Sequence, residues 1–401
     1  MPMLDLDVEL SEEERTVRDL VHTFAAEVMR PAGIKLDGLA DPADVVAPQS
    51  ILWEVFRKYR ALGLEAYSDP ANDEVTPMQR ARLRYLIAEE MGWGDSGLAI
   101  SFGVAGFPRM MAQLSGKPAL IERFGDPNSI GCWGGTEPRH GSDFIAFGDK
   151  VGTAAYGKPD CVARKDGDFF VINGQKAAWV SNGTIATASA LFCAVDMGSG
   201  VIGTGGFVVP LDVPGVSRGK PLDKIGQRAL NQGEIFFEDV RVPADYLVFS
   251  PDMQVFAFDA VLSMANSGMG STFVGVAQAA LDLAIAYAKE RVQGGVPIFQ
   301  HQSVRARLFE MFRKVESARA LSRKVMMYNV LNTPPQLHYA VASKVTATNT
   351  AFEVASAALQ IFGGNGLSRE YPIEKLLRDA RASMIEDGCN EVLGLVGSTR
   401  L

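Results

Sequence analysis

The stretch GCWGGTEPRHGSD, residues 131–143, stands where the character of the chain changes from helical to β-rich. Its glycines let backbone N–H groups approach a ligand closely, and Thr136 and Ser142 add hydroxyl groups. Turns rich in Gly and Ser are also ordinary connections in β domains. The stretch by itself therefore marks a boundary in the fold, and its function depends on what surrounds it.

Before this boundary the apolar residues recur at helical spacing. SEEE at residues 11–14 is a capping-box sequence, and Val17, Val21 and Phe24 follow it on one face. This pattern predicts a helix that ends near Pro31, because proline interrupts a helix. A similar pattern over residues 80–91 predicts another helix. We therefore expect residues 1–129 to form a helical domain.

After the boundary the chain contains short β-rich runs and then long helical ones. The β-rich runs, separated by Gly, Pro and Asn turns, predict a mainly antiparallel β domain over residues 130–245; they are 169–172, 190–195, 206–209 and 234–237. Apolar residues then recur every fourth position from Phe273 to Ile285, and further helices are expected over 304–329 and 336–361. Residues 246–401 are thus predicted to be helical, and the fold class is mainly α with a central β domain.

The composition limits the classes of protein to which the chain can belong. Its 401 residues favour two or three domains, and 47% hydrophobic against 21% charged residues indicate a folded chain. The net charge of −8 and the lack of a Lys/Arg cluster among aromatics exclude general nucleic-acid binding. The acidic N-terminus, and an apolar stretch interrupted by Gln278 and Asp282, predict neither a signal peptide nor a membrane span.

The cysteines and histidines indicate a metal-free, reducing setting. The four cysteines are widely separated and form no Cys-x-x-Cys pair, which predicts reduced thiols in a cytoplasm. The four histidines show no metal-ligand spacing. No metal site is therefore expected.

Local motifs leave alternatives open. The chain contains neither a Gly-x-Gly-x-x-Gly helix start after a strand nor a Walker loop, which disfavours Rossmann and P-loop enzymes. Trp179 before Ser181 could cover and hydrogen-bond an aromatic cofactor, or could be a core residue before a turn. Arg291 could pair with a phosphate or simply end a helix. Asp387 and Gly388 form a turn dipeptide, with Asn390 as the expected N-cap of a short helix.

Taken together and in order, these stretches resemble the acyl-CoA dehydrogenase family of flavoproteins over essentially the whole chain. The matching stretches are TEPxxGSD at 136–143, NGxK at 173–176 before WVSN at 179–182, FEDVRVP at 237–243, YAKER at 287–291, QIFGGNG at 360–366 and RDAR at 378–381. The resemblance implies an N-terminal helical domain, a β-barrel-like middle domain and a C-terminal four-helix bundle. It also implies a tetramer or dimer that holds FAD partly between subunits.

The resemblance assigns residues to the cofactor. Trp133 and Thr136 would line the flavin ring, with Ser142 near the cofactor or the thioester. Trp179 would pack on the ring and Ser181 would approach its N5 edge. The positions that hold the ADP half of FAD would be Arg291, Gln302, Gln360, Gly363 and Gly364. A pyrophosphate suits a guanidinium and closely approaching backbone, which agrees with these residue types.

The reaction implied is α,β-dehydrogenation of an acyl-CoA or another acyl thioester, with electrons passed to an electron-transferring flavoprotein. A carboxylate takes the α proton while hydride leaves for flavin N5. The family usually has Glu before the Gly of its C-terminal motif, and this chain has Asp387 there. A slip of one residue would select Glu386, but the RDAR anchor argues for Asp387. Some members of the family take their catalytic Glu from the first long helix of the C-terminal domain. At that place this chain has Ala265 and Asn266.

Other departures bear on the substrate. The usual aromatic after Arg-x-Gln is replaced by Gly294, Cys389 follows the base and its glycine, and Ala178 is an apparent insertion before Trp179. Gly103 and Gly106 lie where the substrate-cavity helix should run. Small residues there predict room for a bulky acyl group, although glycine also suits helix ends.

Two alternative functions fit the altered base. A nitroalkane-oxidase-like enzyme of the same superfamily uses an aspartate base, and it would produce hydrogen peroxide from nitroalkanes without acting on acyl-CoA. A weakly active or non-catalytic partner subunit of a heteromeric acyl-CoA dehydrogenase would keep the fold without a complete site. Such a subunit would be colourless when purified.

Overall fold

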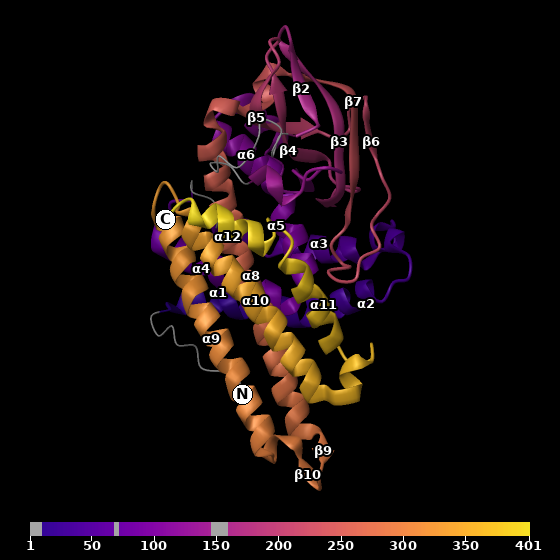
Figure 1. Ribbon diagram of the computed structural model, residues 1–401, viewed down its shortest axis with the longest axis vertical. Coiled ribbons are helices and arrows are strands. Elements are labelled where there is room, and N and C mark those ends of the chain that lie inside the picture. The colour runs from indigo at the N-terminus through magenta and orange to yellow at the C-terminus, as the bar shows by residue number, and fades with distance from the viewer. Residues whose placement is uncertain (1–9, 68–71, 146–158) are drawn as a thin grey trace.

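The computed structural model describes residues 10–67, 72–145 and 159–401. Figure 1 shows a sheet domain at one end of the molecule and long helices that extend away from it. The predicted class, mainly α with a central β domain, is confirmed by the order of the elements along the chain. Helices precede the sheet, and helices follow it.

The N-terminal part contains seven α-helices in the described residues: α1 (Glu12–Phe24), α2 (Arg30–Asp37), α3 (Ile51–Ala61), α4 (Pro77–Gly94), α5 (Ser96–Ala105), α6 (Phe107–Ser115) and α7 (Pro118–Phe124). The predicted capping box is present, because the Ser11 hydroxyl accepts the Glu14 N–H and the Glu14 carboxylate accepts the Ser11 N–H. This reciprocal pair satisfies two N–H groups that the first turn would otherwise leave unpaired.

The predicted helix end near Pro31 is wrong. A π-helical turn, Ala25–Met29, follows α1 and leads directly into α2. Pro31 lies in the first turn of α2, where its missing N–H and its fixed φ are tolerated. The local change in hydrogen bonding therefore lets the helical path continue through a residue that usually ends it.

One sheet contains eight strands: β1 (Gly131–Gly134), β2 (Val162–Asp166), β3 (Phe169–Ser181), β4 (Ala188–Asp196), β5 (Val201–Pro210), β6 (Val216–Arg218), β7 (Gln232–Pro243) and β8 (Leu247–Phe249). The main path runs β6-β7-β3-β2-β4-β5-β8, and β1 pairs with β4. Pairing is antiparallel except between β1 and β4 and between β2 and β4. The mainly antiparallel prediction is confirmed, and β8 extends the sheet beyond residue 245.

Strand β3 carries an irregularity that fits the apparent insertion at Ala178. Its register against β7 shifts between Lys176 and Val180, where four steps along β3 match two along β7. Such a bulge bends a strand and re-aims the side chains on it. The bulge immediately precedes Ser181 and includes Trp179.

The C-terminal part contains α8 (Gln254–Glu290), α9 (Gln302–Leu331), α10 (Leu337–Phe362), α11 (Ile373–Ser383) and α12 (Asn390–Ser398), with a short hairpin, β9 (Val292–Gln293) and β10 (Val296–Pro297). Helices α8, α9 and α10 run side by side (Figure 1), and a shared core of mostly small residues packs between them. Helix α8 has 37 residues and spans about 55 Å. An 18-residue stretch of this helix is apolar enough to cross a membrane by composition, but 72% of that stretch is buried inside the protein.

Candidate active site

The turn between α11 and α12 brings two carboxyl groups next to each other. We call residues 386–388 the carboxylate turn. Its backbone is unusual, because Asp387 has φ 52° and Gly388 has φ 92°. Lys344 on α10 donates to the Gly388 carbonyl at 2.9 Å, and the Cys389 N–H donates to the Ser142 hydroxyl at 2.9 Å. The turn is therefore anchored both to the helical bundle and to the 131–143 stretch.

Asp387 has an accessible and unbonded carboxylate. Among the residues that the structure describes, none is recorded as donating a hydrogen bond to it, and its surface is exposed. Protein surrounds it on most sides all the same, so it lies in a water-accessible recess. Burial raises the pKa of Asp387 above its ordinary value, and the Lys344 cation opposes that rise.

Among the described residues, the Glu386 carboxylate has a hydrogen-bond donor and the Asp387 carboxylate does not. Its Oε1 accepts a hydrogen bond of 2.6 Å from the Gln227 side-chain amide. Burial, followed by the neighbouring Asp387 charge, raises the pKa of Glu386 to about 7. Burial lowers the pKa of Lys344 to about 8. The two carboxyls therefore differ in role, since one is constrained within the protein and the other is open to a ligand.

The 131–143 stretch lies directly against β3. The Ala177 N–H donates to the Thr136 carbonyl at 3.0 Å. The fully buried Lys176 amine donates to the Gly135 carbonyl at 3.1 Å and to Glu137 at 2.5 Å. Thr136 is thus fixed beside the strand that carries Trp179 and Ser181, and the predicted place of these three residues at one flavin ring stays a prediction.

The two predicted ligand-facing residues at the end of β3, Trp179 and Ser181, differ in their surroundings. Trp179 is 58% exposed, which is high for so large an apolar ring and typical of a surface that a ligand covers. The Ser181 hydroxyl accepts a hydrogen bond of 3.2 Å from Gln232. Asn182, which follows with φ 61°, is fully buried and bonds Ser101 of α5. The turn after Ser181 is therefore fixed to the N-terminal helices.

Trp133 lies among aromatic side chains rather than alone. Its ring centroid is 5.2 Å from Phe107 and 4.4 Å from Phe192. These contacts belong to a core cluster between β4, α8 and α12. Its predicted place beside the flavin ring stays a prediction, and packing alone accounts for its present position.

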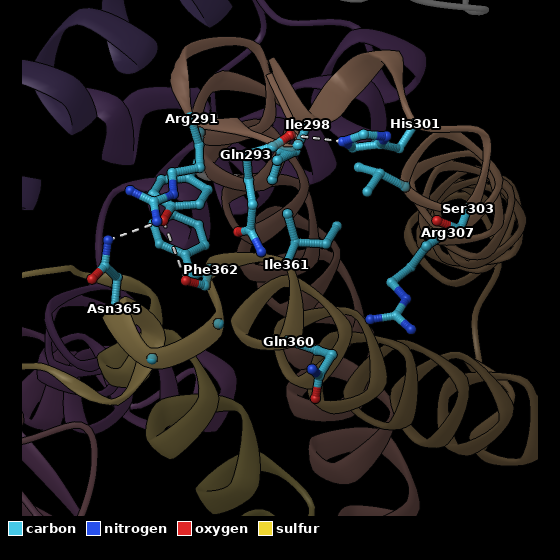
Figure 2. Close-up of a pocket in the computed structure, with 15 residues that line it drawn as sticks. Arg291, Gln293, Ile298, His301, Ser303, Arg307, Gln360, Ile361, Phe362 and Asn365 are labelled. Carbon is cyan, nitrogen blue, oxygen red and sulfur yellow. Dashed lines mark hydrogen bonds between the residues drawn. The ribbon is translucent and has the colours of Figure 1, made fainter. Parts of the chain in front are cut away.

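A second concave region lies where the end of α8, the start of α9 and the end of α10 meet, and Figure 2 shows it in close-up. This cavity, which we call the α8–α10 pocket, has a volume of about 730 Å³. Of the predicted cofactor residues, Arg291, Gln360, Gly363 and Gly364 line it, whereas Gln302 does not, although its neighbours His301 and Ser303 do. The remaining lining residues are Tyr287, Gln293, Gly294, Ile298, Val304, Arg307, Ile361, Phe362 and Asn365.

The pocket is suited to an anion. Arg291 and Arg307 lie on its opposite sides (Figure 2), and none of the described lining residues is acidic. A Cβ atom added at Gly363 or Gly364 would meet nothing within 4 Å, so this loop leaves free space beside its backbone. Guanidinium groups and close backbone together fit a pyrophosphate. The residues present therefore fit the ADP half of a dinucleotide.

Sequence reasoning missed Arg307, because no motif includes it. It follows Ser303 by one helical turn, and both face the pocket from α9. That spacing could have identified it once His301 and Ser303 were known to line a cavity. Tyr287 and Asn365 belong to the YAKER and QIFGGNG stretches, which assigned them no role. The Asn365 side-chain amide donates a hydrogen bond of 3.0 Å to the Tyr287 hydroxyl.

A cluster of Glu137, His140 and Asp160 has its ligand atoms within 4.8 Å of one another. The carboxylates in it already bind cations, because Glu137 pairs with Lys176 and Asp160 with Arg139. These contacts account for the cluster as a set of ion pairs.

Comparison with known proteins agrees with this geometry. The family model described as "Acyl-CoA dehydrogenase, middle domain" matches residues 132–240, and "Acyl-CoA dehydrogenase, C-terminal domain" matches residues 259–401. The short-chain specific acyl-CoA dehydrogenase, mitochondrial, of Rattus norvegicus is 31% identical over 395 residues, 97% of this chain and 90% of that one. The chain belongs to the acyl-CoA dehydrogenase family.

Other relatives extend over the same length. The cyclohex-1-ene-1-carbonyl-CoA dehydrogenase of Geobacter metallireducens is 30% identical over 400 residues, 96% of this chain and 97% of that protein. The solved butyryl-CoA dehydrogenase of Megasphaera elsdenii has a TM-score of 0.83 and 27% identity, covering 98% of this chain and 99% of that one. The predicted family and enzyme class are confirmed: this acyl-CoA dehydrogenase is an oxidoreductase that acts on an acyl-CoA.

Proposed function

We propose that this enzyme dehydrogenates the α,β bond of an acyl-CoA with FAD as cofactor and Asp387 as the base. The observation that carries the assignment is the contrast within the carboxylate turn. Asp387 is open and has no hydrogen-bond partner in the described residues, whereas Glu386 is bonded to Gln227. A general base must reach the proton that it removes, which favours the free carboxylate.

The setting of Asp387 suits proton removal near neutral pH. Burial raises its pKa, so its carboxylate is a stronger base than an ordinary aspartate. The Lys344 cation opposes this rise in the pKa of Asp387 and so favours the charged carboxylate. Aspartate is one methylene shorter than glutamate, and the left-handed backbone at residue 387 alters the direction in which the side chain leaves the turn.

The two regions of this chain would bind different parts of FAD. When bound, the cofactor supplies a flat ring that accepts the hydride. The residues that would lie against that ring are Trp133, Thr136, Trp179 and Ser181, with Ser142 near the cofactor or the thioester. The residues that would bind the ADP half are Arg291, Gln360, Gly363 and Gly364, together with Gln302, which does not itself line the pocket.

The separation of these regions favours an oligomer. Lys344, beside the carboxylate turn, and Phe362, in the α8–α10 pocket, lie 18 residues apart on α10, or about 27 Å. We therefore propose a homotetramer or homodimer in which the pocket of one copy completes the site of another. Electrons would pass to an electron-transferring flavoprotein. A cytoplasmic location would fit the four free cysteines.

The test is the visible spectrum of the purified protein under anaerobic conditions, before and after addition of a panel of acyl-CoAs. Bleaching of a flavin band by at least one acyl-CoA is the expected result. A yellow protein that no acyl-CoA bleaches, and that forms hydrogen peroxide with nitroalkanes, would contradict the proposal in favour of the oxidase. A colourless protein that does not bind added FAD would favour the partner subunit.

A further inference from the structure

The loop between β6 and β7 lies between the two sides of the proposed reaction. We call residues 219–231 the linking loop. A Cβ atom added at Gly226 would come within 2.5 Å of the Arg378 carbonyl, so the loop backbone lies directly against α11. A Cβ atom at Gly97 of α5 would come within 3.1 Å of the Leu230 nitrogen. The loop is therefore packed between the N-terminal and C-terminal helices.

The carboxylate turn needs support from outside itself. Asp387 has a left-handed backbone, a conformation that costs a non-glycine residue energy and persists only when its surroundings determine it. Its own carboxylate makes no recorded hydrogen bond within the described residues. This backbone conformation must therefore be stabilised through the neighbouring residues. On the C-terminal side Lys344 bonds Gly388 and Ser142 bonds Cys389, and on the N-terminal side Gln227 bonds Glu386.

Gln227 is a rigid attachment point for the N-terminal side. It is 2% exposed and has φ 49°. Its backbone N–H donates to the Asp379 carboxylate, and its side-chain amide donates to Glu386 at 2.6 Å. Asp379 in turn pairs at 2.6 Å with Lys375, which also binds Asp95 at the start of α5. The group that binds Glu386 is thus fixed to all three parts of the chain.

The same loop is bonded to the end of β3. The Lys224 amine donates to the carbonyls of Gln227 and Leu230, at 3.0 and 2.8 Å, and to the Gln232 side chain at 2.8 Å. The Gln232 amide donates to the Trp179 carbonyl at 3.3 Å and to the Ser181 hydroxyl at 3.2 Å. A continuous chain of partly buried hydrogen bonds therefore runs from Ser181 to Glu386.

We infer that Gln227, fixed by Lys224, is a positioning residue that sets the place of the carboxylate turn relative to Trp179 and Ser181. The inference rests on the proposed function, because it assigns those groups to the base side and the hydride side of one reaction. Proton and hydride leave adjacent carbons, so the base and the acceptor must be correctly spaced at the same time. A single loop that is bonded to both sides sets that spacing within one chain.

The test compares the holoenzyme with Gln227→Ala, Glu386→Ala and the double variant. Hydrogen exchange in the segment 384–392, which needs no substrate, should become about tenfold faster in each single variant. With an acyl-CoA that bleaches the wild type, kcat should fall about 10- to 100-fold with little change in KM. The double variant should be no worse than either single one, because both remove the same contact.

Two further variants separate positioning from general damage. Glu386→Gln keeps an acceptor for Gln227 and should restore most of the activity lost in Glu386→Ala. Gln278→Ala also removes hydrogen bonds, to Asp282 and Arg319, but far from the turn, and exchange in 384–392 should stay at the wild-type rate. Unchanged exchange in Gln227→Ala, or additive losses in the double variant, would overturn the inference. If no acyl-CoA reduces the wild type, the proposed function fails, and the exchange data still decide whether Gln227 fixes the turn.

Discussion

The carboxylate turn and the α8–α10 pocket show two ways in which a chain prepares a site. Around the turn, Glu386, Gly388 and Cys389 already have hydrogen-bond partners on other elements. In the pocket, Arg291 and Arg307 face a cavity with no acidic lining residue in the described chain. The first region is held by contacts within the protein, whereas the second offers positive charge and open space that would suit the proposed cofactor.

The largest loss of stability is expected in the organised region. Lys176 and Glu137 form an ion pair with fully buried side chains beside Thr136. Glu137→Gln should lower the free energy of unfolding by about 3–5 kcal/mol, because it leaves a buried cation unpaired. Urea unfolding measures this. The matched control is Arg139→Gln, whose pair with Asp160 is exposed and whose loss should leave the free energy of unfolding close to the wild-type value. Equal losses in the two variants would contradict this prediction.

A substitution in the α8–α10 pocket should weaken the binding of FAD and leave the stability of the apoprotein unchanged. Arg291→Ala removes a guanidinium from the cavity and should weaken FAD binding to the apoprotein about 10- to 100-fold, with the melting temperature of the apoprotein unchanged. Titration of FAD fluorescence measures the dissociation constant. Arg305→Ala, on the same helix as Arg307 but outside the pocket, is the control and should bind FAD as the wild type does. An Arg291→Ala protein with wild-type affinity would remove the pocket from the cofactor site.

A smaller effect on activity is expected when the positive charge of Lys344, which is bonded to the carboxylate turn, is removed. Lys344 opposes the rise in the pKa of Asp387, so Lys344→Met should raise that pKa further. A base must be deprotonated to act, so the acidic limb of the kcat/KM profile should move to higher pH. Activity should fall more at pH 6 than at pH 8, and Lys344→Arg should retain the wild-type profile. An acidic limb that stays in place in Lys344→Met would exclude this electrostatic role.

The smallest effect concerns the predicted room for a bulky acyl group. A Cβ atom at Gly103 would meet nothing within 4 Å, and the residue is exposed on α5. Gly103→Leu should change the free energy of unfolding by less than about 1 kcal/mol. It should also shift the ratio of kcat/KM values toward small straight-chain acyl-CoAs over ring-bearing ones by about tenfold. An unchanged ratio would place the acyl group elsewhere.

The parts of the fold that the sequence predicts are those set by local signals. The Ser11 capping box and the β-rich run at 169–172 depend on residues close together in the chain, and the structure contains both. Four residues that the resemblance assigned to the ADP half of FAD line one pocket: Arg291, Gln360, Gly363 and Gly364. Asp387 as the base remains a prediction.

The parts that could not be predicted depend on distant contacts. Gln227 and Glu386 are 159 residues apart in the chain, and no pattern joins them. Asn390, expected as an N-cap, is instead the first residue of α12, after Cys389 as the N-cap. Its side chain points inward because the buried Lys344 amine donates to its oxygen at 2.8 Å. Lys344 needs polar oxygens inside the bundle, and that requirement outweighs the local preference of Asn for a cap.

The most direct test of the central claim is the rate of flavin bleaching by a reactive acyl-CoA under anaerobic conditions in Asp387→Asn and Glu386→Gln. Both variants remove one carboxylate from the same turn and keep its size. With Asp387 as the base, we predict that Asp387→Asn keeps its FAD but is reduced about 100- to 10,000-fold more slowly, while Glu386→Gln stays within about tenfold of the wild type. The reverse order, with Glu386→Gln inactive and Asp387→Asn active, would contradict it.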